Sequence, residues 1–444
     1  MPPPGLSESY GALPAAQAPD SFRSIAVSEQ GSWRRRLLGF IGPGYLVAVG
    51  YMDPGNWATD LAGGAAFAYS LLWVVLLASL MATLLQILSA RLGIVTGMDL
   101  AQACRRHYAP RSVFAQWILC ELAICAADLA EVIGTAIALN LLFGLPLKWG
   151  VALTVLDVLL VLWFQRRHFR YLEATVMALL VVVFVCFAVT LILAQPDWAA
   201  VARGFVPQAQ GLADPHRLYL AIGIIGATVM PHNLYLHSST VQTRRYSLTP
   251  RGRRNACGFA AIDVVLALLL AFCVNAAILI TAAAVFHFSG HQALAEIQQA
   301  HLLLTPLLGT SIASFLFALA LLASGQSSTL TATLAGQIVM EGYLEWKLPA
   351  WARRLITRLI AIVPALFVTA WFGERGTAQL LIFSQVFLSL QLPFAIIPLV
   401  RFTSAPAIMG EFANHQAITL LAWLVAGIVI VMNLMMLATL LNLL

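Results

Sequence analysis

Long apolar stretches separated by short polar connections run along most of the chain. Each stretch is long enough for an α-helix to cross the hydrocarbon core of a membrane, which takes about 20 apolar residues. The pattern therefore predicts an all-α polytopic membrane protein with eleven transmembrane helices in one transmembrane domain at 33–444. The predicted spans cover residues 38–68, 70–94, 112–143, 147–164, 171–194, 217–243, 256–286, 310–340, 355–372, 376–400 and 416–443.

Composition agrees with this pattern, because 61% of the residues are hydrophobic and only 10% are charged. About a quarter of the residues in a typical soluble domain are charged, so composition excludes an ordinary soluble protein. Residues 1–32 differ from the rest of the chain: they contain many Pro, Ala and Ser residues and lack apolar periodicity. We expect them to form a disordered cytoplasmic tail.

The positive charges predict the orientation in the membrane. If the N-terminus is cytoplasmic, 21 of the 25 Lys and Arg residues fall on the inner side, and only Lys148, Arg203, Arg217 and Arg375 fall outside. Cytoplasmic connections retain positive charge, so we expect a cytoplasmic N-terminus and an extracytoplasmic C-terminus in the cell (inner) membrane. The net charge of +6 reflects this bias and suits a lipid bilayer with an anionic inner leaflet as partner, so it requires no nucleic-acid partner.

Two apolar stretches are interrupted by the same kind of motif. The first span contains Asp-Pro-Gly-Asn at 53–56, and the sixth contains Met-Pro-His-Asn at 230–233. Proline removes a backbone donor and clashes with the preceding turn, so both helices should break there. We expect Pro54, Gly55, Pro231 and Asn233 to open the backbone and to permit movement between conformations.

The position of the two breaks predicts an internal repeat. They lie five spans apart on oppositely oriented helices, so residues 38–194 and 217–400 would form inverted repeats of five helices, with 416–443 as an extra helix. Interrupted helices at matching positions of two halves point to the binding site of a secondary transporter. Broken backbone at membrane depth is tolerated where it lines a cavity or is buried in protein.

The chemistry of the two breaks favours a metal cation. Asp53 supplies a carboxylate, Asn56 an amide oxygen, and Gly50 and Ala227 supply backbone carbonyls, while Met230 supplies a thioether sulfur. An ionisable residue within a span is a functional hypothesis by default. Because a thioether is a soft ligand, the mixed site favours Mn²⁺, Fe²⁺ or another transition metal over Mg²⁺ and Ca²⁺.

At these motifs the chain resembles the Nramp family of divalent-metal transporters, of the bacterial manganese-uptake type. The similarity extends from about Trp33 to the end and includes "ELAICAADLAEVIGTA", "RRLITR" and "SQVFLSLQLPFA". The resemblance implies a LeuT-like fold with helices 1 and 6 broken, and metal uptake coupled to protons. It implies metal ligands at Asp53, Asn56, Met230 and the Ala227 carbonyl. It adds Gln385 in an occluded state and the carbonyl of Gly50, where relatives often have alanine.

Acidic residues in the third span suggest how protons move. Glu121, Asp128 and Glu131 lie within about 80° of one another on a helix and form a stripe ~15 Å long. The stripe has a purely structural alternative, in which it neutralises Arg354 and Arg358. Carboxylates paired with arginines also build proton relays. The resemblance implies that Asp128 and Glu131 carry the proton from Asp53 toward the cytoplasm, with both arginines as partners.

Three other polar residues lie within predicted spans. His232 and His237 are five residues apart, about 140° around a helix, so they cannot chelate one ion together. We interpret His232 as a gating or proton-linked residue and His237 as a packed or hydrogen-bonded helix residue. For Asn275, the resemblance suggests a polar contact that stabilises the outward-open state.

These observations predict proton-coupled uptake of Mn²⁺ and Fe²⁺ by alternating access, in which the cytoplasmic half of helix 1 swings open. We expect no enzymatic activity, no cofactor and a functional monomer. The alternatives are a related transporter for Mg²⁺ or an amino acid, and a metal-sensing receptor on the same fold. Met230 disfavours Mg²⁺, and an intramembrane enzyme would need a nucleophile with a base or a closed His-rich metal site.

Overall fold

The computed structural model describes residues 23–27, 32–157, 159, 163, 169–207, 214–292, 296–346, 348–371 and 376–440. Nearly all of the secondary structure in these residues is helical. The α-helices are α1 (Trp33–Phe40), α2 (Pro43–Gly50), α3 (Pro54–Phe67), α4 (Leu72–Thr96), α5 (Leu100–His107), α6 (Pro110–Phe143), α7 (Leu147–Leu153), α9 (Phe169–Ala194), α10 (Trp198–Gly204), α11 (Pro215–Thr228), α12 (Pro231–Thr240), α13 (Pro250–Ala282), α14 (Ile297–Leu308), α15 (Ser311–Leu344), α16 (Ala350–Trp371), α17 (Thr377–Ser404), α18 (Pro406–Met409) and α19 (Gln416–Leu440). Shorter elements are the 3₁₀ turns η2 (Ala68–Leu71), η3 (Thr154–Leu156), η5 (Val241–Thr243) and η8 (Gly410–Phe412), the π-helical turn η6 (Ala283–His287), and the strands β1 (Ile25–Ala26) and β2 (Arg244–Arg245).

Within the described residues, nine helical stretches are long and apolar enough to cross a membrane. One of them, Pro54–Thr96, joins α3 and α4 through η2 and so contains parts of the first two predicted spans. The span predicted at 147–164 is represented by the shorter apolar helix Leu147–Leu156, and parts of it lie outside the described residues. The all-α membrane class is confirmed, while the count of eleven spans stays a prediction.

Proline explains where many of these helices begin. Its missing N–H is unpaired anyway in the first turn, and its fixed φ suits a helix. A proline occupies the first position of seven of the described helices, α2, α3, α6, α11, α12, α13 and α18, at Pro43, Pro54, Pro110, Pro215, Pro231, Pro250 and Pro406. The prolines thus start helices in this chain, and two of them do so inside an apolar stretch.

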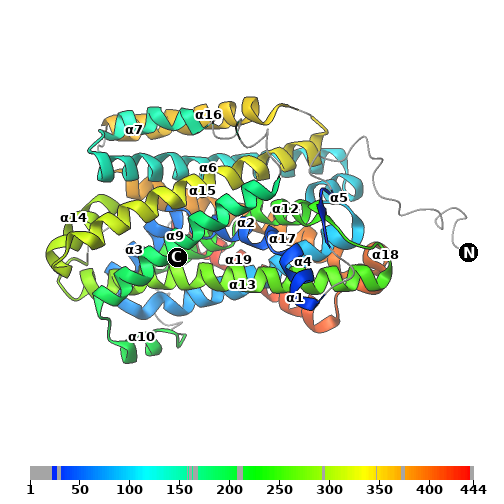
Figure 1. The fold of residues 1–444 in the computed structure, drawn as a ribbon, viewed down its shortest axis with the longest axis horizontal. Helices are drawn as coiled ribbons and strands as arrows, with labels where there is room; N and C mark the ends of the chain where they lie inside the picture. The colour runs from blue at the N-terminus through cyan, green and yellow to red at the C-terminus, as the bar shows by residue number, and fades with distance from the viewer. Residues whose placement is uncertain are drawn as a thin grey trace, which may run out of the picture.

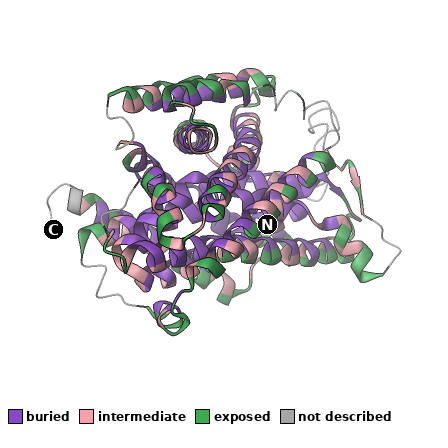
Figure 2. Ribbon diagram, turned by 60° about the vertical axis from the view of Figure 1, so that its left-hand side comes forward, coloured by how far each residue is buried: buried purple, intermediate pink, exposed green. Residues whose placement is uncertain are grey.

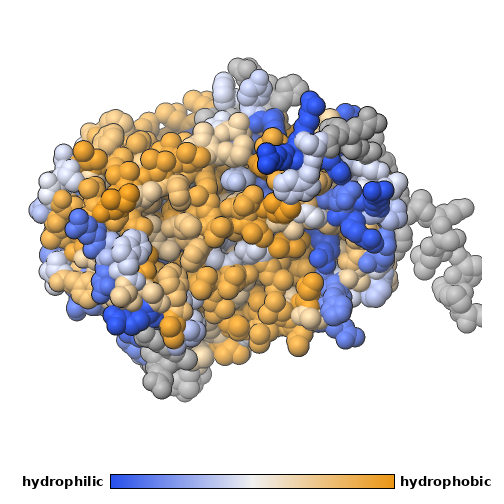
Figure 3. Space-filling view, turned by 60° about the horizontal axis from the view of Figure 1, so that its bottom comes forward, coloured by the Kyte–Doolittle hydropathy of each residue, from blue (hydrophilic) through white to orange (hydrophobic). Residues whose placement is uncertain are grey.

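Buried residues occupy the centre of the helix assembly, and exposed ones follow its outer surface (Figure 2). Many of the exposed side chains are large and apolar, as expected for a surface that faces lipid. A broad band of hydrophobic side chains covers the face in Figure 3, and hydrophilic side chains gather at the end where Figure 1 places α1, α5 and α18. The surface is therefore divided as in a membrane protein.

The helices that follow the first break lie at the centre of the assembly. α3 packs against α11, α13 and α17, and the long helices α6 and α15 pack against each other. α7 and α16 lie side by side along one face of α6 (Figure 1). This arrangement places α6 between the broken helices and the arginine-bearing helix α16.

A short parallel sheet joins the segment before α1 to the segment after α12. In β1, Ile25 and Ala26 pair with Arg244 and Arg245 of β2, directly after η5. Residues 23–27 belong to the tail that we expect to be disordered, yet the structure describes them as part of this sheet; residues 1–22 and 28–31 lie outside the described residues. The pairing partners that order residues 23–27 lie more than 200 positions away in the sequence, where a local pattern cannot show them.

Candidate functional site

Both predicted helix breaks are present, and they have the same local construction. α2 ends at Gly50 and α3 begins at Pro54, while α11 ends at Thr228 and α12 begins at Pro231. The residue before each proline is extended, with φ/ψ of −66°/167° at Asp53 and −68°/123° at Met230. Each proline therefore disfavours helical backbone in the residue before it and starts a new helix.

Four of the predicted ligand positions meet around one amide group. Asn56 Nδ2 donates to Asp53 Oδ1 at 2.7 Å, to the Ala227 carbonyl at 3.1 Å and to the Gly50 carbonyl at 3.4 Å. Asp53 and Asn56 are both buried. One carboxylate and two carbonyls, drawn from both breaks, thus surround a single donor. Such a set of oxygen atoms attracts a cation. A half-turn of the amide would present its oxygen at the same place.

The opposite side of the Asn56 amide is held by two further polar residues. Its Oδ1 accepts from Thr228 Oγ1 at 3.5 Å and from Asn275 Nδ2 at 3.4 Å, and Asn275 Nδ2 also donates to the Tyr51 carbonyl at 2.8 Å. The polar contact predicted for Asn275 is therefore present, and its role in the outward-open state stays a prediction. We did not predict Thr228, although a hydroxyl directly before the second break was a usable signal.

Met230 is buried between helices rather than exposed to a solvent-filled space. Its side chain packs with Ala123 and Ala127 of α6 and with Leu388 of α17. The Ala227 carbonyl, three residues earlier in the chain, accepts from Asn56. Met230 is the one soft ligand of the predicted set.

Gln385 lies against both breaks. A Cβ atom on Gly55 would stand 1.9 Å from Gln385 Nε2, and one on Gly226 would stand 2.2 Å from the Gln385 carbonyl oxygen. Gln385 Nε2 donates to Ser384 Oγ at 2.9 Å, whereas its buried Oε1 has no hydrogen-bond partner among the described residues. An amide oxygen is therefore available beside the site.

Gly55 has a different role from the one expected. It lies inside α3 and is not among the glycines with positive φ, so it does not open the backbone. It provides room for Gln385 instead. Asn233 uses space in a similar way: a Cβ on Gly50 would stand 2.4 Å from Asn233 Nδ2. Both polar atoms of the Asn233 side chain are buried without a hydrogen-bond partner in the described part of the chain.

The acidic stripe on α6 meets the arginines of α16. Arg354 contacts Asp128 through Nη1 and Glu131 Oε2 through Nη2 at 3.0 Å, and Arg358 lies 3.8 Å from the same Glu131 oxygen. Thr329 Oγ1 donates to Glu131 at 3.1 Å. The predicted pairing of Asp128 and Glu131 with these arginines is confirmed as geometry, and all four charged groups are buried.

The ion-pair network also contains members that we did not predict. Glu121 pairs with Arg353 at 2.7 Å rather than with the two predicted arginines, and Arg358 pairs with Asp157 after η3. Asp157 is the only acidic residue of the apolar stretch 147–164, which was a usable signal. Asp60, a buried carboxylate in α3, carried the same signal.

The two histidines have separate environments. His232 Nδ1 is buried without a hydrogen-bond partner among the residues described. His237 Nδ1 bonds Gln86 Oε1 at 3.0 Å, and Gln86 Nε2 donates to Tyr51 Oη at 2.7 Å. The interpretation of His237 as a hydrogen-bonded helix residue is confirmed. No three His, Cys, Asp or Glu residues gather as a metal site in the described part of the chain.

A separate polar cluster fastens the start of α2. Asp263 of α13 accepts from the backbone N–H groups of Gly42 at 3.2 Å and Gly44 at 2.7 Å. Arg244 pairs with Glu173 of α9 and donates to the Ile41 carbonyl at 2.8 Å. The start of α2 is thus attached directly to α13, and Ile41 just before it is attached to β2, whose Arg244 also pairs with α9. We did not predict this cluster, although Glu173 and Asp263 are acids in apolar stretches.

Comparison with known proteins places these features in a family. A divalent metal cation transporter of Bradyrhizobium diazoefficiens is 62% identical over 415 residues, which is 94% of this chain and 92% of that protein. Its counterpart in Xanthomonas campestris is 61% identical over 428 residues, covering 96% and 95%.

Solved structures agree with the sequence relatives. A manganese transporter of Eremococcus coleocola is 42% identical, with a TM-score of 0.87 over 95% of this chain and 90% of that one. MHP1, a nucleobase-cation-symport-1 family transporter, has a TM-score of 0.59 at 14% identity over 95% of this chain and 93% of its own, a likeness of fold alone. The model of the family described as natural resistance-associated macrophage protein-like matches residues 44–439, so the chain belongs to the Nramp family.

Proposed function

We propose that this chain imports divalent transition-metal ions, Mn²⁺ and Fe²⁺, together with protons by alternating access. The observation that carries the proposal is the meeting of Asp53, Asn56 and the Ala227 carbonyl, which come from both helix breaks. The relatives named as divalent metal cation transporters and the manganese transporter of similar structure support the choice of substrate.

The metal would be held by the Asp53 carboxylate, the Asn56 amide oxygen, the carbonyls of Gly50 and Ala227, and the Met230 sulfur. Gln385 would join in an occluded state through its Oε1 atom. Carboxylate and carbonyl oxygens suit many divalent ions, and the soft thioether adds attraction mainly for transition metals. Because both breaks contribute ligands, ion binding draws the two halves of the protein together.

The repeat and the orientation belong to the same proposal. Eleven spans would form two inverted units, which begin with α2/α3 and with α11/α12, and α19 would be the extra helix. The shared construction of the two breaks supports this repeat. The distribution of Lys and Arg supports a cytoplasmic N-terminus, an extracytoplasmic C-terminus and a place in the cell membrane. We propose that the monomer is the functional unit.

The proton pathway rests on a count of buried charges. Asp128, Glu131 and Asp157 face Arg354 and Arg358, so three carboxylates share two guanidinium groups. A buried charge without a partner is costly, and one added proton removes the excess negative charge. Asp128 Oδ2 is buried and has no hydrogen-bond partner among the described residues, so it can hold that proton.

The path would lead from Asp53 along α6 toward its cytoplasmic end. His232 lies beside the second break with a free, buried ring nitrogen and would link the site to Asp128 and Glu131. Glu121 is the next acidic residue toward the start of α6 and pairs with Arg353, and it would release the proton toward the cytoplasm. The metal would leave separately, once α2 detaches from Asp263 and swings open.

Uptake into proteoliposomes tests the proposal. Intact protein should carry Mn²⁺ inward along its gradient and acidify the interior, as read by a metal-quenched dye and a pH dye. Asp53→Asn should reduce both signals at least a hundredfold, because the only carboxylate of the ligand set is lost. Asp197→Asn is the matched control, since Asp197 is exposed and only caps α10. Equal uptake by the intact protein and Asp53→Asn would refute the assigned site.

A further inference from the structure

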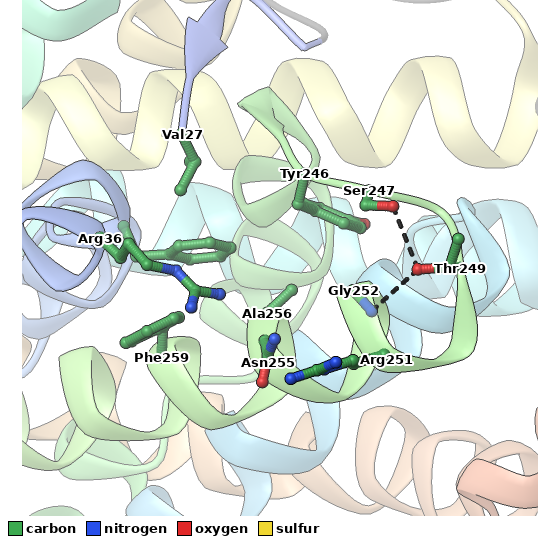
Figure 4. Close-up of a pocket in the computed structure, with 11 residues that line it drawn as sticks. Val27, Arg36, Tyr246, Ser247, Thr249, Arg251, Gly252, Asn255, Ala256 and Phe259 are labelled. Atoms are coloured by element: carbon green, nitrogen blue, oxygen red, sulfur yellow. Dashed lines mark hydrogen bonds between the residues drawn. The ribbon is translucent and has the colours of Figure 1, made fainter. Parts of the chain in front are cut away.

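A pocket of about 240 Å³ lies at the polar end of the molecule, away from the helix breaks. Its wall combines α1, the connection after β2 and the first turns of α13, and β1 adjoins it. Figure 4 shows Arg36 from α1 and Arg251 from α13 reaching the same side of this pocket, next to Asn255. Tyr246 and Phe259 supply aromatic walls. The metal site described above uses none of these residues.

The charge of the pocket is positive and uncompensated. Neither Arg36 nor Arg251 forms an ion pair with any residue that the structure describes. The guanidinium of Arg36 lies 5.2 Å from the centre of the Phe259 ring, and its Nε is buried without a hydrogen-bond partner among the described residues. A buried guanidinium nitrogen without an acceptor favours an anionic ligand.

The donors around the pocket suit a phosphate group. A guanidinium presents paired N–H donors that match the oxygens of a phosphate. The pocket adds the Asn255 amide and the hydroxyl groups of Ser247 and Thr249. The start of the 33-residue helix α13 adds a favourable dipole. The volume is several times the ~30 Å³ that one water molecule occupies, so a phosphate with part of its substituent fits.

The position of α1 points to a lipid as the source of the phosphate. This helix exposes Trp33 and Leu38 as well as Arg34 and Arg35, and Leu248, between the lining residues Ser247 and Thr249, is also exposed. An amphipathic, Arg-rich helix with exposed apolar residues is typical of the membrane interface. Basic clusters next to a transmembrane helix attract anionic lipids of the cytoplasmic leaflet.

We propose that this pocket binds the phosphate of an anionic phospholipid headgroup between Arg36 and Arg251. The assignment to the cytoplasmic leaflet rests on the orientation given under the proposed function. The bound headgroup would clamp α1 onto α13, and α1 leads directly into α2, the half-helix that must move during transport. Anionic lipid would therefore favour the state in which α2 stays fastened.

Thermal unfolding of the full chain in an uncharged detergent tests this proposal. The probes are dioctanoyl phosphatidylglycerol, dioctanoyl phosphatidylcholine and inorganic phosphate. Phosphatidylglycerol should raise the unfolding temperature in a saturable way, and phosphatidylcholine should not. Arg36→Gln with Arg251→Gln should raise the phosphatidylglycerol concentration needed for half-saturation at least tenfold. The control, Arg34→Gln with Arg245→Gln, removes the same charge from exposed positions outside the pocket and should behave like the unaltered protein.

Several outcomes would overturn the assignment. An equal response of the pocket variant and the unaltered protein would exclude the pocket, and an equal loss in the control would leave only general charge attraction. Saturation by inorganic phosphate at the concentration that suffices for the lipid would assign a free phosphate instead. If the glutamine pair does not fold, Arg36→Lys with Arg251→Lys keeps the charge but loses the forked donors, so it should bind severalfold more weakly; unchanged affinity would contradict the proposal. The assay contains no metal, so a failure of the proposed transport would leave its result unaffected.

Discussion

The ion-pair network between α6 and α16 allows two opposite perturbations. Asp128→Asn removes one of the three carboxylates that face Arg354 and Arg358, so that two charges of each sign remain. Arg354→Gln instead leaves three carboxylates facing one guanidinium group. Both variants remove one charge from the same buried contact. They differ in whether the remaining charges balance, and Arg354→Gln also removes the contact with Glu131.

The expected magnitudes follow from this balance. In Asp128→Asn, Arg354 keeps its 3.0 Å contact with Glu131. The loss of one hydrogen bond to a charged group costs about 1.5–3 kcal/mol, and relief of the excess negative charge offsets part of this cost. In Arg354→Gln, removal of one partner strands buried charge, which costs about 3–5 kcal/mol. We therefore expect Arg354→Gln to be clearly less stable than Asp128→Asn.

Stability and proton movement can be measured on the same preparations. Apparent unfolding temperatures in detergent should fall in the order unaltered protein, Asp128→Asn, Arg354→Gln. In proteoliposomes, Asp128→Asn should bind Mn²⁺ with little change but acidify the interior at least tenfold more slowly, because the network no longer needs a proton. A lower unfolding temperature for Asp128→Asn than for Arg354→Gln would refute the charge count. An unaltered pH signal would refute the relay.

Three further predictions concern other parts of the molecule. Met230→Ala should keep part of the Mn²⁺ transport, but its preference for Mn²⁺ over Ca²⁺ should fall about tenfold, which is about 1.4 kcal/mol. Unchanged competition by Ca²⁺ would count against a soft ligand. Asp263→Asn should weaken the attachment of α2 by about 1–3 kcal/mol, seen as faster hydrogen exchange around Gly44, and unchanged exchange would contradict this role. Burial raises the pKa of Asp99 in the connection between α4 and α5 to about 7, from 3.8. The protonated Asp99 carboxyl therefore contributes stability that is fully present below pH 3.8 and is lost as the pH rises through about 7. The side chain introduced by Asp99→Asn does not titrate but can still cap α5. Between pH 5 and pH 8 the unfolding temperature of this variant should therefore fall less than that of the unaltered protein.

The features that sequence predicted well are those with a local physical cause. Proline restricts its own residue and the one before it, so both helix breaks could be located from the two Pro-containing motifs alone. Buried carboxylates are rare in apolar stretches, which marked Asp53, Asp128 and Glu131 before any neighbour was known. Arg354 and Arg358 could be matched to the acidic stripe because they stand near the inner end of one span.

The features that sequence did not predict depend on contacts between distant segments. Asp157 and Arg358 are 201 residues apart in the sequence, and they meet because α7 and η3 pack against α16. Gly55 looked like a helix breaker, but its small size serves the Gln385 side chain on α17. The attachment of Gly44 to Asp263 likewise joins residues 219 positions apart. Residue types indicate that such groups need partners, and only the packing shows which partners they have.

The parallel pairing of β1 with β2 has a practical consequence for handling the protein. A truncation that stops before Arg23 keeps the strand, whereas one that continues past Val27 removes it and exposes the backbone edge of Arg244–Arg245. Affinity tags, fluorescent fusions and protease sites at the N-terminus therefore lie next to the β1–β2 pairing and to α1, which leads into α2. Tags at the opposite end of the chain, after α19, would leave the pairing of β1 with β2 undisturbed.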